Sequence, residues 1–386
     1  MAYHRARSSW SELPWDLLDC ILQHLELPEA LAVASVCAPW RYAAGVLGVP
    51  RSGTPWLVSQ SLGISPGEKA PGSEFRNLVL GASKTYTVSL PQRRHHLALC
   101  GASQGWLIGS DELSDLLLYN PFTFAVIPLP PITDLGGVRA VYDHDGLTIV
   151  GYDYGNSDEL LCRPPNKHAL GCRFYEKVAL SCDPSRGGGD CIAMAIYGIN
   201  QRRLLMLKVG GGQWMAPLQI DQEEVGVRQD NESPDPQKRF YSVTMYGVVA
   251  TWDLDTGPAQ EPEKHVIINA EATYRGILAR FLVSTPWGGL LQIRVKRRTG
   301  RYRSSQIKVE VLEVDVEERT LVKLSRATAF REHAVFVGLN ESACLDAKVA
   351  SFNIFTHHSA KVRSSIHSWV LAGGMPIQTF PIPRLV

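Results

Sequence analysis

From residue 56 onward the chain is a long series of short apolar runs, and this pattern limits the folds open to it. The runs include residues 106–108, 175–180, 192–197 and 277–283, which are rich in β-forming residues and bounded by Gly, Pro, Asn or Asp. No strong helical pattern separates them, so crossover helices and a parallel sheet are not expected. The pattern predicts antiparallel sheets arranged as a sandwich, a barrel or a propeller.

A weak internal repeat favours the propeller. A glycine followed by an apolar run recurs at Gly105, Gly146, Gly247 and Gly289, at intervals of 41, 101 and 42 residues, and the long interval has room for one more unit near Gly198. Repeats of about 40–50 residues are typical of propeller blades. The remaining part of the chain would make six or seven blades, although a glycine before a strand is common in any all-β protein.

Residues 10–44 instead carry a helical pattern. An apolar stripe with the period of a helix is formed by Leu17, Leu18, Ile21, Leu22 and Leu25. Pro14, Pro28 and Pro39 divide the segment into three short helices. Such a small unit buries only a thin core, and the stripe is wider than that core can cover. Part of the stripe should therefore pack on the rest of the chain or remain available to another protein.

This helical segment resembles an F-box over its whole length. The resemblance rests on Leu13-Pro14, Asp16-Leu17-Leu18, Ile21-Leu22, Leu31, Ser35-Val36-Cys37 and Trp40-Arg41. It implies docking on the Skp adaptor of a cullin-RING ubiquitin ligase. The adaptor contacts that it implies are Leu13, Pro14, Leu17, Ile21, Leu22, Leu25, Leu31, Val36 and Trp40. The sequence departs from the family at Ala38-Pro39, where a polar or basic residue is usual, and this leaves the start of the third helix open.

Residues 101–131, GASQGWLIGSDELSDLLLYNPFTFAVIPLPP, are similar to a blade of the plant F-box proteins with a KIB-type domain. Further matching segments are residues 177–181, Asp183-Pro184, 194–198, 252–254 and 335–342. The resemblance covers the chain from about Pro55 to its last strand, and it implies a plant substrate receptor of a ubiquitin ligase. The proline-glycine and paired acidic residues of the family are replaced by Val349-Ala350-Ser351 and His357-His358, so the role of that loop cannot be carried over.

The expected fold class is α+β multidomain, with a small N-terminal three-helix F-box followed by an all-β domain that forms a six- or seven-bladed β-propeller. The expected bounds are a disordered N-terminus at 1–9, the F-box at 10–48, a linker at 49–55 and the KIB-type β-propeller at 56–386.

Composition excludes several classes of function. The 39 basic and 38 acidic residues give a formal net charge of +1, which favours neither a general nucleic-acid binder nor a membrane-surface protein. The sequence shows no signal-peptide core and no run of the ~20 apolar residues that a membrane span needs. We therefore expect a protein of the nucleus or cytoplasm. The eight cysteines lack metal-ligand spacing, so we expect neither a metal site nor a cofactor.

One stretch is strongly basic. Its residues are Lys296, Arg297, Arg298, Arg301 and Arg303. They are a candidate contact patch for an acidic partner, a phosphate or nucleic acid. They could also act as a nuclear localisation signal. Thr299-Gly300 lies between two strand-like runs, so the alternative interpretation is a solvated hairpin tip.

The carboxylates that could supply acid–base pairs are Asp111, Glu112, Asp115, Asp153, Asp158 and Glu159. No nucleophile, oxyanion or metal-ligand pattern accompanies them, so we interpret them as polar loop residues and expect no catalytic residue. Two polar segments, 221–238 and 255–264, are also expected to be exposed loops, where a propeller would select its target.

Three functions remain open from the sequence. The first is a substrate receptor, in which the helical unit docks the Skp adaptor and the propeller holds an unknown protein target near the ligase. The second is an F-box protein that binds partners but has no ligase role. The third is a propeller enzyme, which would need a clustered acid or nucleophile that the sequence does not show. Only the first predicts that a target accumulates when the protein is lost.

Overall fold

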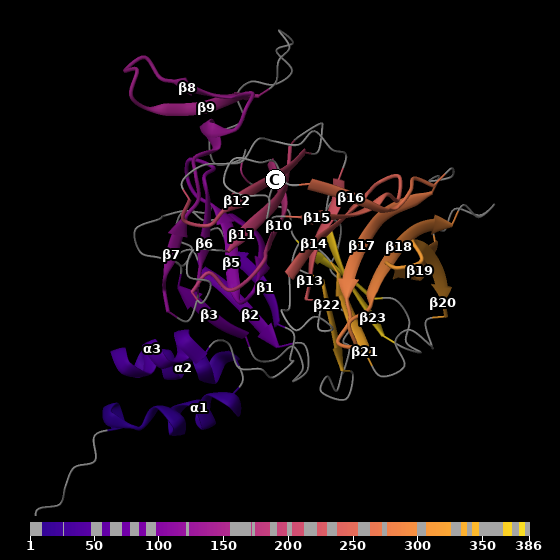
Figure 1. Cartoon of the computed structure of the whole chain (residues 1–386). Coiled ribbons are helices and arrows are strands. Elements are labelled where there is room, and N and C mark those ends of the chain that lie inside the picture. The colour runs from indigo at the N-terminus through magenta and orange to yellow at the C-terminus, as the bar shows by residue number, and fades with distance from the viewer. Residues whose placement is uncertain are drawn as a thin grey trace, which may run out of the picture.

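The structure is a computed structural model in which short N-terminal helices precede a series of antiparallel sheets (Figure 1). The described residues are 10–25, 27–47, 56–61, 72–77, 85–89, 98–120, 123–154, 171, 174–185, 191–198, 203–211, 222–229, 238–253, 263–271, 276–298, 306–325, 333–337, 342–346, 366–372 and 378–382. The expected N-terminal segment 1–9 and the expected linker 49–55 lie outside them. None of the described helices is long and apolar enough to cross a membrane.

The prolines begin the helices, as predicted. The helical elements are η1 (Trp10–Glu12), α1 (Trp15–Gln23), α2 (Leu27–Val36) and α3 (Ala38–Leu47). Pro14 is the N-cap of α1, and its carbonyl accepts hydrogen bonds from the amides of Leu17 and Leu18, each at 3.1 Å. Pro28 and Pro39 are the second residues of α2 and α3, where a missing N–H costs nothing. The third helix thus begins normally at Ala38.

The strands follow in chain order. They are β1 (Trp56–Ser61), β2 (Gly72–Asn77), β3 (Thr85–Ser89), β4 (Ala98–Ser103), β5 (Trp106–Ser110), β6 (Leu116–Tyr119), β7 (Val126–Pro128), β8 (Val138–Tyr142), β9 (Ile149–Tyr154), β10 (Tyr175–Leu180), β11 (Ile192–Tyr197), β12 (Arg203–Lys208), β13 (Gln222–Gln229), β14 (Lys238–Thr244), β15 (Val249–Asp253), β16 (Glu263–Ile268), β17 (Ile277–Ser284), β18 (Leu290–Arg298), β19 (Gln306–Asp315), β20 (Thr320–Leu324), β21 (His333–Val337), β22 (Ala343–Asp346), β23 (Ile366–Ala372) and β24 (Gln378–Ile382). A short 3₁₀ turn, η2 (Ile132–Asp134), precedes β8.

The sheets have the arrangement of propeller blades. Within the described ranges, six sheets have three or four strands, in the orders β1-β2-β3, β4-β5-β6-β7, β10-β11-β12, β13-β14-β15-β16, β17-β18-β19-β20 and β22-β21-β23-β24. The first strands of successive sheets contact each other, β4 with β10, β10 with β13, and β13 with β17. This succession of short antiparallel sheets is the radial repetition of a β-propeller. The two-stranded sheet β8-β9 lies beyond one end of these blades (Figure 1).

Neighbouring blades are joined by separate apolar clusters, because alternate residues of a strand point to opposite faces. In β10, Val178 and Leu180 pack toward β4–β7, whereas Ala179 packs with Phe240 and Trp252 of the next blade. A polar bond adds to the first of these contacts, since the indole Nε1 of Trp106 donates to Asp183 at 2.8 Å. This bond joins two of the segments that carry the family resemblance.

One prediction about loops is wrong. The polar segment 221–238 contains β13. Of the segment 255–264, only the last two residues are described, and they begin β16, so the loop prediction for the rest lies outside the described residues. The strand β13 pairs with β14 from Gln222 to Gln229, so its backbone is hydrogen-bonded although its sequence lacks an apolar run. Sheet neighbours, more than intrinsic preference, decide whether such a polar segment becomes a strand.

The glycine repeat also does not mark equivalent places in successive blades. Gly105 lies between the first two strands of its sheet and Gly247 lies between the second and third, while Gly146 lies in the β8–β9 turn outside the blades. The repeat therefore marks turns, and the blades follow from the strand pairing.

The helices pack directly on the sheet β4–β7. The buried residues of this shared core are Leu18, Leu22, Ala30, Ala34, Ala43 and Ala44 from the helices and Leu107, Leu117 and Tyr119 from the sheet. At Gly45 of α3 a Cβ atom would clash with Cγ2 of Thr123, so a larger residue there would require the Thr123 side chain to shift. The Arg41 guanidinium lies 5.6 Å from the ring centroid of Phe124, at cation–π distance. The helical unit and this blade therefore form one packed body.

Truncating the Leu22 side chain should destabilise the fold, because Leu22 lies in this shared core. Leu22 is 2% exposed and Leu17 is 51% exposed on the same helix. We expect Leu22→Ala to lower the free energy of unfolding by about 2–4 kcal/mol, because it leaves a cavity. The matched change Leu17→Ala should cost less than about 0.5 kcal/mol. Denaturant unfolding of the two variants measures the difference, and equal losses would show that α1 does not pack on the sheet.

Candidate functional site

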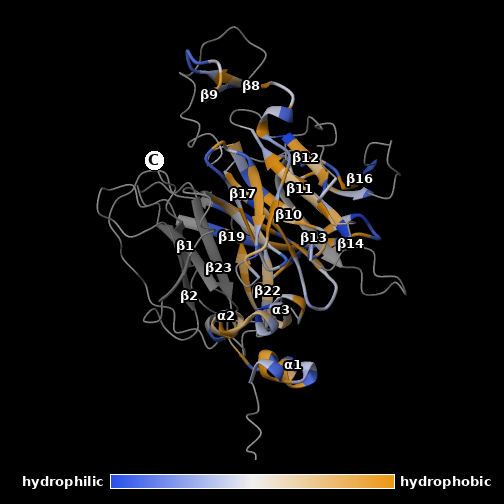
Figure 2. Cartoon of the chain, turned by 90° about the vertical axis from the view of Figure 1, so that its left-hand side faces the viewer, coloured by the Kyte–Doolittle hydropathy of each residue, from blue (hydrophilic) through white to orange (hydrophobic). Residues whose placement is uncertain are grey.

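The outer side of α1 presents apolar side chains to solvent. Leu17 and Ile21 are one helical turn apart and exposed, whereas Leu18 and Leu22 are one turn apart and buried in the shared core. In Figure 2, α1 shows hydrophobic and hydrophilic residues together at one end of the molecule. The apolar stripe of the sequence is thus divided between an internal contact and an exposed pair.

The structure divides the nine predicted adaptor contacts into groups. Exposed members are Pro14, Leu17, Ile21 and Val36; partly buried members are Leu13, Leu25 and Trp40, which pack on the shared core. Leu22 is buried, and the side chain of Leu31 lies outside the described residues. The exposed members are accessible to a partner as the chain stands. A direct contact through Leu22 would require the helix to move, and the adaptor role of the whole set stays a prediction.

Sequence reasoning missed three exposed large apolar residues of α1 and α3, which are Trp15, Tyr42 and Val46. The rings of Trp15 and Tyr42 lie 6.0 Å apart, between α1 and α3. Tyr42 and Val46 are four residues apart in α3, a spacing that the sequence shows and that could have identified them. The Trp15–Tyr42 contact joins two helices and has no signal in the sequence.

Polar contacts hold α2 and α3 in place beneath these exposed residues. Nε of Arg41 donates to the carbonyl of Ala34 at 3.1 Å, and Nε1 of Trp40 donates to the carbonyl of Trp10 at 2.8 Å. Because Arg41 also lies against Phe124, one side chain links both helices to the sheet. The exposed apolar residues therefore stand on a fixed support.

Part of the predicted basic stretch lies on β18. Lys296 is described there, the side chains of Arg297 and Arg298 are not, and Arg301 and Arg303 lie outside the described residues. Strands β18 and β19 pair antiparallel with Arg298 opposite Gln306, as the hairpin interpretation expects.

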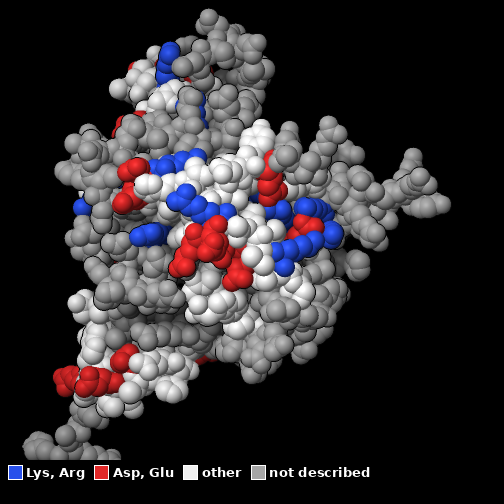
Figure 3. Space-filling view, turned by 45° about the vertical axis from the view of Figure 1, so that its right-hand side comes forward, with Lys and Arg blue, Asp and Glu red and all other residues white. Residues whose placement is uncertain are grey.

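Lys296 belongs to a group that the sequence did not show, which we call the basic strand face: Lys296, Lys308, Lys323 and the carboxylate of Glu310. Nζ of Lys296 lies 2.5 Å from Oε2 of Glu310, whereas Lys308 and Lys323 lie 3.4 and 3.6 Å from its Oε1. Figure 3 shows a face of the molecule on which Lys and Arg side chains gather beside Asp and Glu side chains. Three cations here share one anion.

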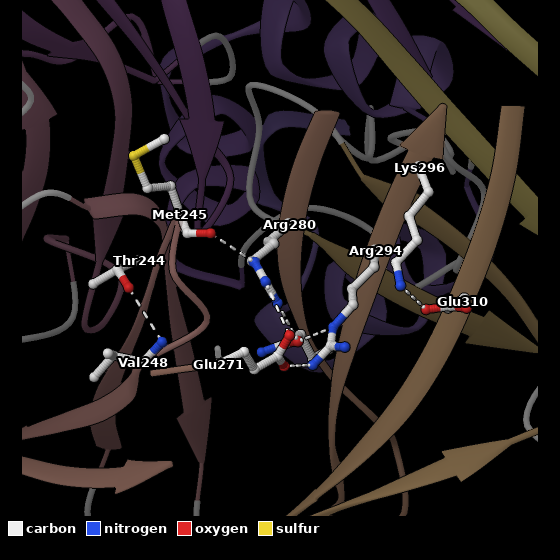
Figure 4. Close-up of polar contacts among 9 residues, drawn as sticks. Thr244, Met245, Val248, Glu271, Arg280, Arg294, Lys296 and Glu310 are labelled. Atoms are coloured by element: carbon white, nitrogen blue, oxygen red, sulfur yellow. Dashed lines mark hydrogen bonds and ion pairs between the residues drawn. The ribbon is translucent and has the colours of Figure 1, made fainter. Parts of the chain in front are cut away.

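A buried polar cluster lies beside this face (Figure 4). Arg280 on β17 is fully buried, and its guanidinium donates to Glu271 at 3.2 Å and to Gln292 at 3.1 Å. Arg294, its cross-strand partner, donates to the same Gln292 oxygen at 2.6 Å and pairs with the other oxygen of Glu271. Glu271 follows β16 in the chain, so one carboxylate ties two arginines of one blade to the preceding blade.

The preceding blade also accommodates Arg280 through its backbone. Nε of Arg280 donates to the carbonyl of Met245 at 3.1 Å. Gly247 has a φ of 87°, and a Cβ atom there would lie 3.0 Å from the guanidinium. The turn β14–β15 therefore needs glycine both for its conformation and for space.

Two of the carboxylates considered for acid–base chemistry, Asp111 and Asp115, have structural roles. Oδ1 of Asp111 accepts hydrogen bonds from the amides of Leu113 and Asp115, and Asp115 accepts one from Ile132 at 2.7 Å. Asp158, Glu159 and the replaced loop residues near 350 lie outside the described residues. Within the described ranges, no group of three or more His, Cys, Asp or Glu side chains could hold a metal ion.

Two family models match this chain. The model described as F-box domain matches residues 10–47, and the model described as KIB1-4 beta-propeller matches residues 75–354, which is more than half of the chain.

Curated relatives match over shorter stretches. Two Arabidopsis thaliana proteins with F-box protein in their names are 28% identical over 164 residues and 30% identical over 162 residues. Each alignment covers 38% of this chain, and they span 38% and 37% of the relatives' own lengths. The F-box/kelch-repeat protein At1g57790 of Arabidopsis thaliana is 30% identical over 127 residues, which cover 32% of this chain and 33% of that protein.

Two solved structures are distantly similar. A complex of KlAtg21 with the coiled-coil of AgAtg16 has a TM-score of 0.36 at 9% identity, covering 82% of this chain and 74% of that one. YCF48 bound to D1 peptide has a TM-score of 0.32 at 12% identity, covering 86% and 88%. The family models, and not these low scores, identify the chain.

Low pH should weaken the ion pairs between Glu310 and the lysines of the basic strand face. Burial alone raises the pKa of Glu310, but the hydrogen bond from Lys296 and the charges of Lys296 and Lys323 outweigh it and lower the pKa from 4.5 to about 2. A carboxyl with a lowered pKa stabilises the fold fully above about pH 4.5, and the stabilisation is lost as the pH falls toward 2. We expect the difference in unfolding free energy between the natural chain and Glu310→Gln to shrink across this window, and a difference that stays constant would contradict the pairing.

Neutralising Glu271 should loosen two blades. Glu271→Gln leaves two desolvated arginines without their anion, and we expect a loss of about 2–3 kcal/mol, below the usual cost for a fully buried pair because Glu271 is partly exposed. The matched control is Glu263→Gln at an exposed position of β16, which should change stability by less than about 0.5 kcal/mol. Denaturant unfolding compares them.

Proposed function

We propose that this chain, which belongs to the F-box proteins with a KIB1-4 β-propeller, is the substrate-recognition subunit of an Skp–cullin–F-box ubiquitin ligase. In this proposal the helical unit docks the Skp adaptor, and the propeller binds a target protein in the nucleus or cytoplasm. The chain itself contributes no catalytic residue.

The observation that carries the proposal is the division of the α1 stripe. Leu17 and Ile21 remain exposed one turn apart, although the same helix has already buried Leu18 and Leu22. Aliphatic residues at this spacing are the anchors by which a helix binds in an apolar groove. Their exposure on a rigidly supported helix supports a partner of that kind.

The packing of the two parts supports the receptor role. Because the helices and the β4–β7 sheet share one core, a target held by the propeller would stay at a nearly constant distance from the adaptor. Ubiquitin transfer to that target then becomes effectively intramolecular, and a high local concentration replaces catalysis by the receptor.

The first test is binding of the purified Skp adaptor to the full chain. We expect Leu17→Lys with Ile21→Lys to weaken binding about 100-fold or more, because two charges would enter an apolar contact. The matched control is Leu147→Lys with Val150→Lys, which places the same charges on exposed apolar positions of the β8–β9 hairpin. This control should bind normally, and thermal melting should be similar for both variants.

The outcomes separate the proposed function from its alternatives. Equal binding by the two double variants, or no binding by the natural chain, would refute the adaptor contact. Adaptor binding without recruitment of a cullin would favour a partner-binding F-box protein that has no ligase role.

A further inference from the structure

We infer that the basic strand face of β18–β20 binds an acidic segment of a protein partner. The inference rests on the proposed function, because it assigns a chemical class to the target segment that the propeller would recognise.

The argument begins with the strand register. Lys296 and Lys308 are directly opposite each other on β18 and β19, and like charges in this position repel. Glu310 is opposite Arg294 and reaches back between the lysines. Its carboxylate is therefore the local counterion that permits this arrangement, and it shows that the face accommodates a carboxylate.

The single carboxylate of Glu310 does not neutralise the charges of all three lysines. Lys296 lies closest to Glu310, whereas Lys308 and Lys323 share its other carboxylate oxygen at the longer distances of 3.4 and 3.6 Å. The side chains of Lys308 and Lys323 are 56% and 66% exposed. Both ammonium groups thus keep donors and positive charge directed to solvent.

The interior adds to the excess of charge. Arg280 and Arg294 lie beside the face and share the carboxylate of Glu271. Among the described side chains, one face of the sheet carries five cations, Arg280, Arg294, Lys296, Lys308 and Lys323, against the carboxylates of Glu310 and of Glu271 from the preceding blade. The other acidic residues of β19, Glu313 and Asp315, alternate to the opposite face. The deeper cations are poorly screened by water. The resulting positive potential favours an anionic ligand over the lysines.

The chemistry of the face favours a protein segment. Its one internal occupant is a glutamate, so Asp and Glu side chains of a partner reproduce a contact already present. Surfaces for single-stranded nucleic acid interleave basic and aromatic side chains, and the described side chains of β18, β19 and β20 include no aromatic residue. Lys323 lies on β20, the last strand of its sheet, where an extended segment has access.

The probe is a fluorescein-labelled peptide of twelve alternating Glu and Ser residues, measured by anisotropy with the full chain at low salt. We expect Lys308→Glu with Lys323→Glu to weaken binding about 10-fold or more, and the same peptide with Gln in place of Glu to bind at least about 10-fold more weakly. Glu310→Gln should tighten binding about 3-fold, because it removes the internal competitor for the lysines.

The single change Lys323→Glu has a matched control in Arg139→Glu, an equal charge reversal on the exposed β8 strand. We expect the control to bind the peptide like the natural chain. Equal effects of the two changes, or weaker binding by folded Glu310→Gln, would overturn the inference. Tight binding of an oligouridylate RNA without binding of the peptide would also overturn it.

The adaptor assay on the same proteins separates this inference from the proposed function. Lys308→Glu with Lys323→Glu should bind the Skp adaptor normally, and Leu17→Lys with Ile21→Lys should bind the acidic peptide normally. Loss of peptide binding alone is a failure of the inference, whereas loss of adaptor binding by the natural chain is a failure of the proposed function.

Discussion

The contact between α1, α3 and the β4–β7 sheet determines what the N-terminal helices can offer to another protein. It takes Leu18 and Leu22 into the interior and leaves Leu17 and Ile21 outside. The close approach at Gly45 and the position of Arg41 against Phe124 bind the helices to the turn that precedes β7. Both interpretations of the apolar stripe therefore hold in part, because one side packs within the chain and the other is exposed.

Within the blades, apolar and polar contacts have different roles. The apolar clusters between successive sheets supply most of the burial, and burial of this kind tolerates small changes in alignment. The Arg280–Glu271–Arg294 cluster accepts little such variation, since all three guanidinium nitrogens of Arg280 have a defined acceptor. Such a cluster fixes how two blades meet, although a buried ion pair adds little to net stability.

Much of the fold was predictable from the sequence, because it depends on local signals. The prolines located the helix starts, and the apolar runs 175–180 and 192–197 coincide with β10 and β11. Strand β13 was missed because it is polar and owes its conformation to β14. The sequence could not assign Leu17 and Leu22 to opposite environments, since both lie within one apolar stripe. The basic strand face was missed because its lysines come from three strands.

The shared core also determines when the helices can fold during synthesis of the chain. Leu18 and Tyr119 belong to one cluster but are 101 residues apart in the chain. At about 5–20 residues per second, the ribosome makes the helices roughly 5–20 s before the strand that covers them. For that interval the nascent helices expose the apolar side chains that they later bury, together with those that stay outside. These helices are therefore prone to aggregation during synthesis until the β4–β7 sheet covers them.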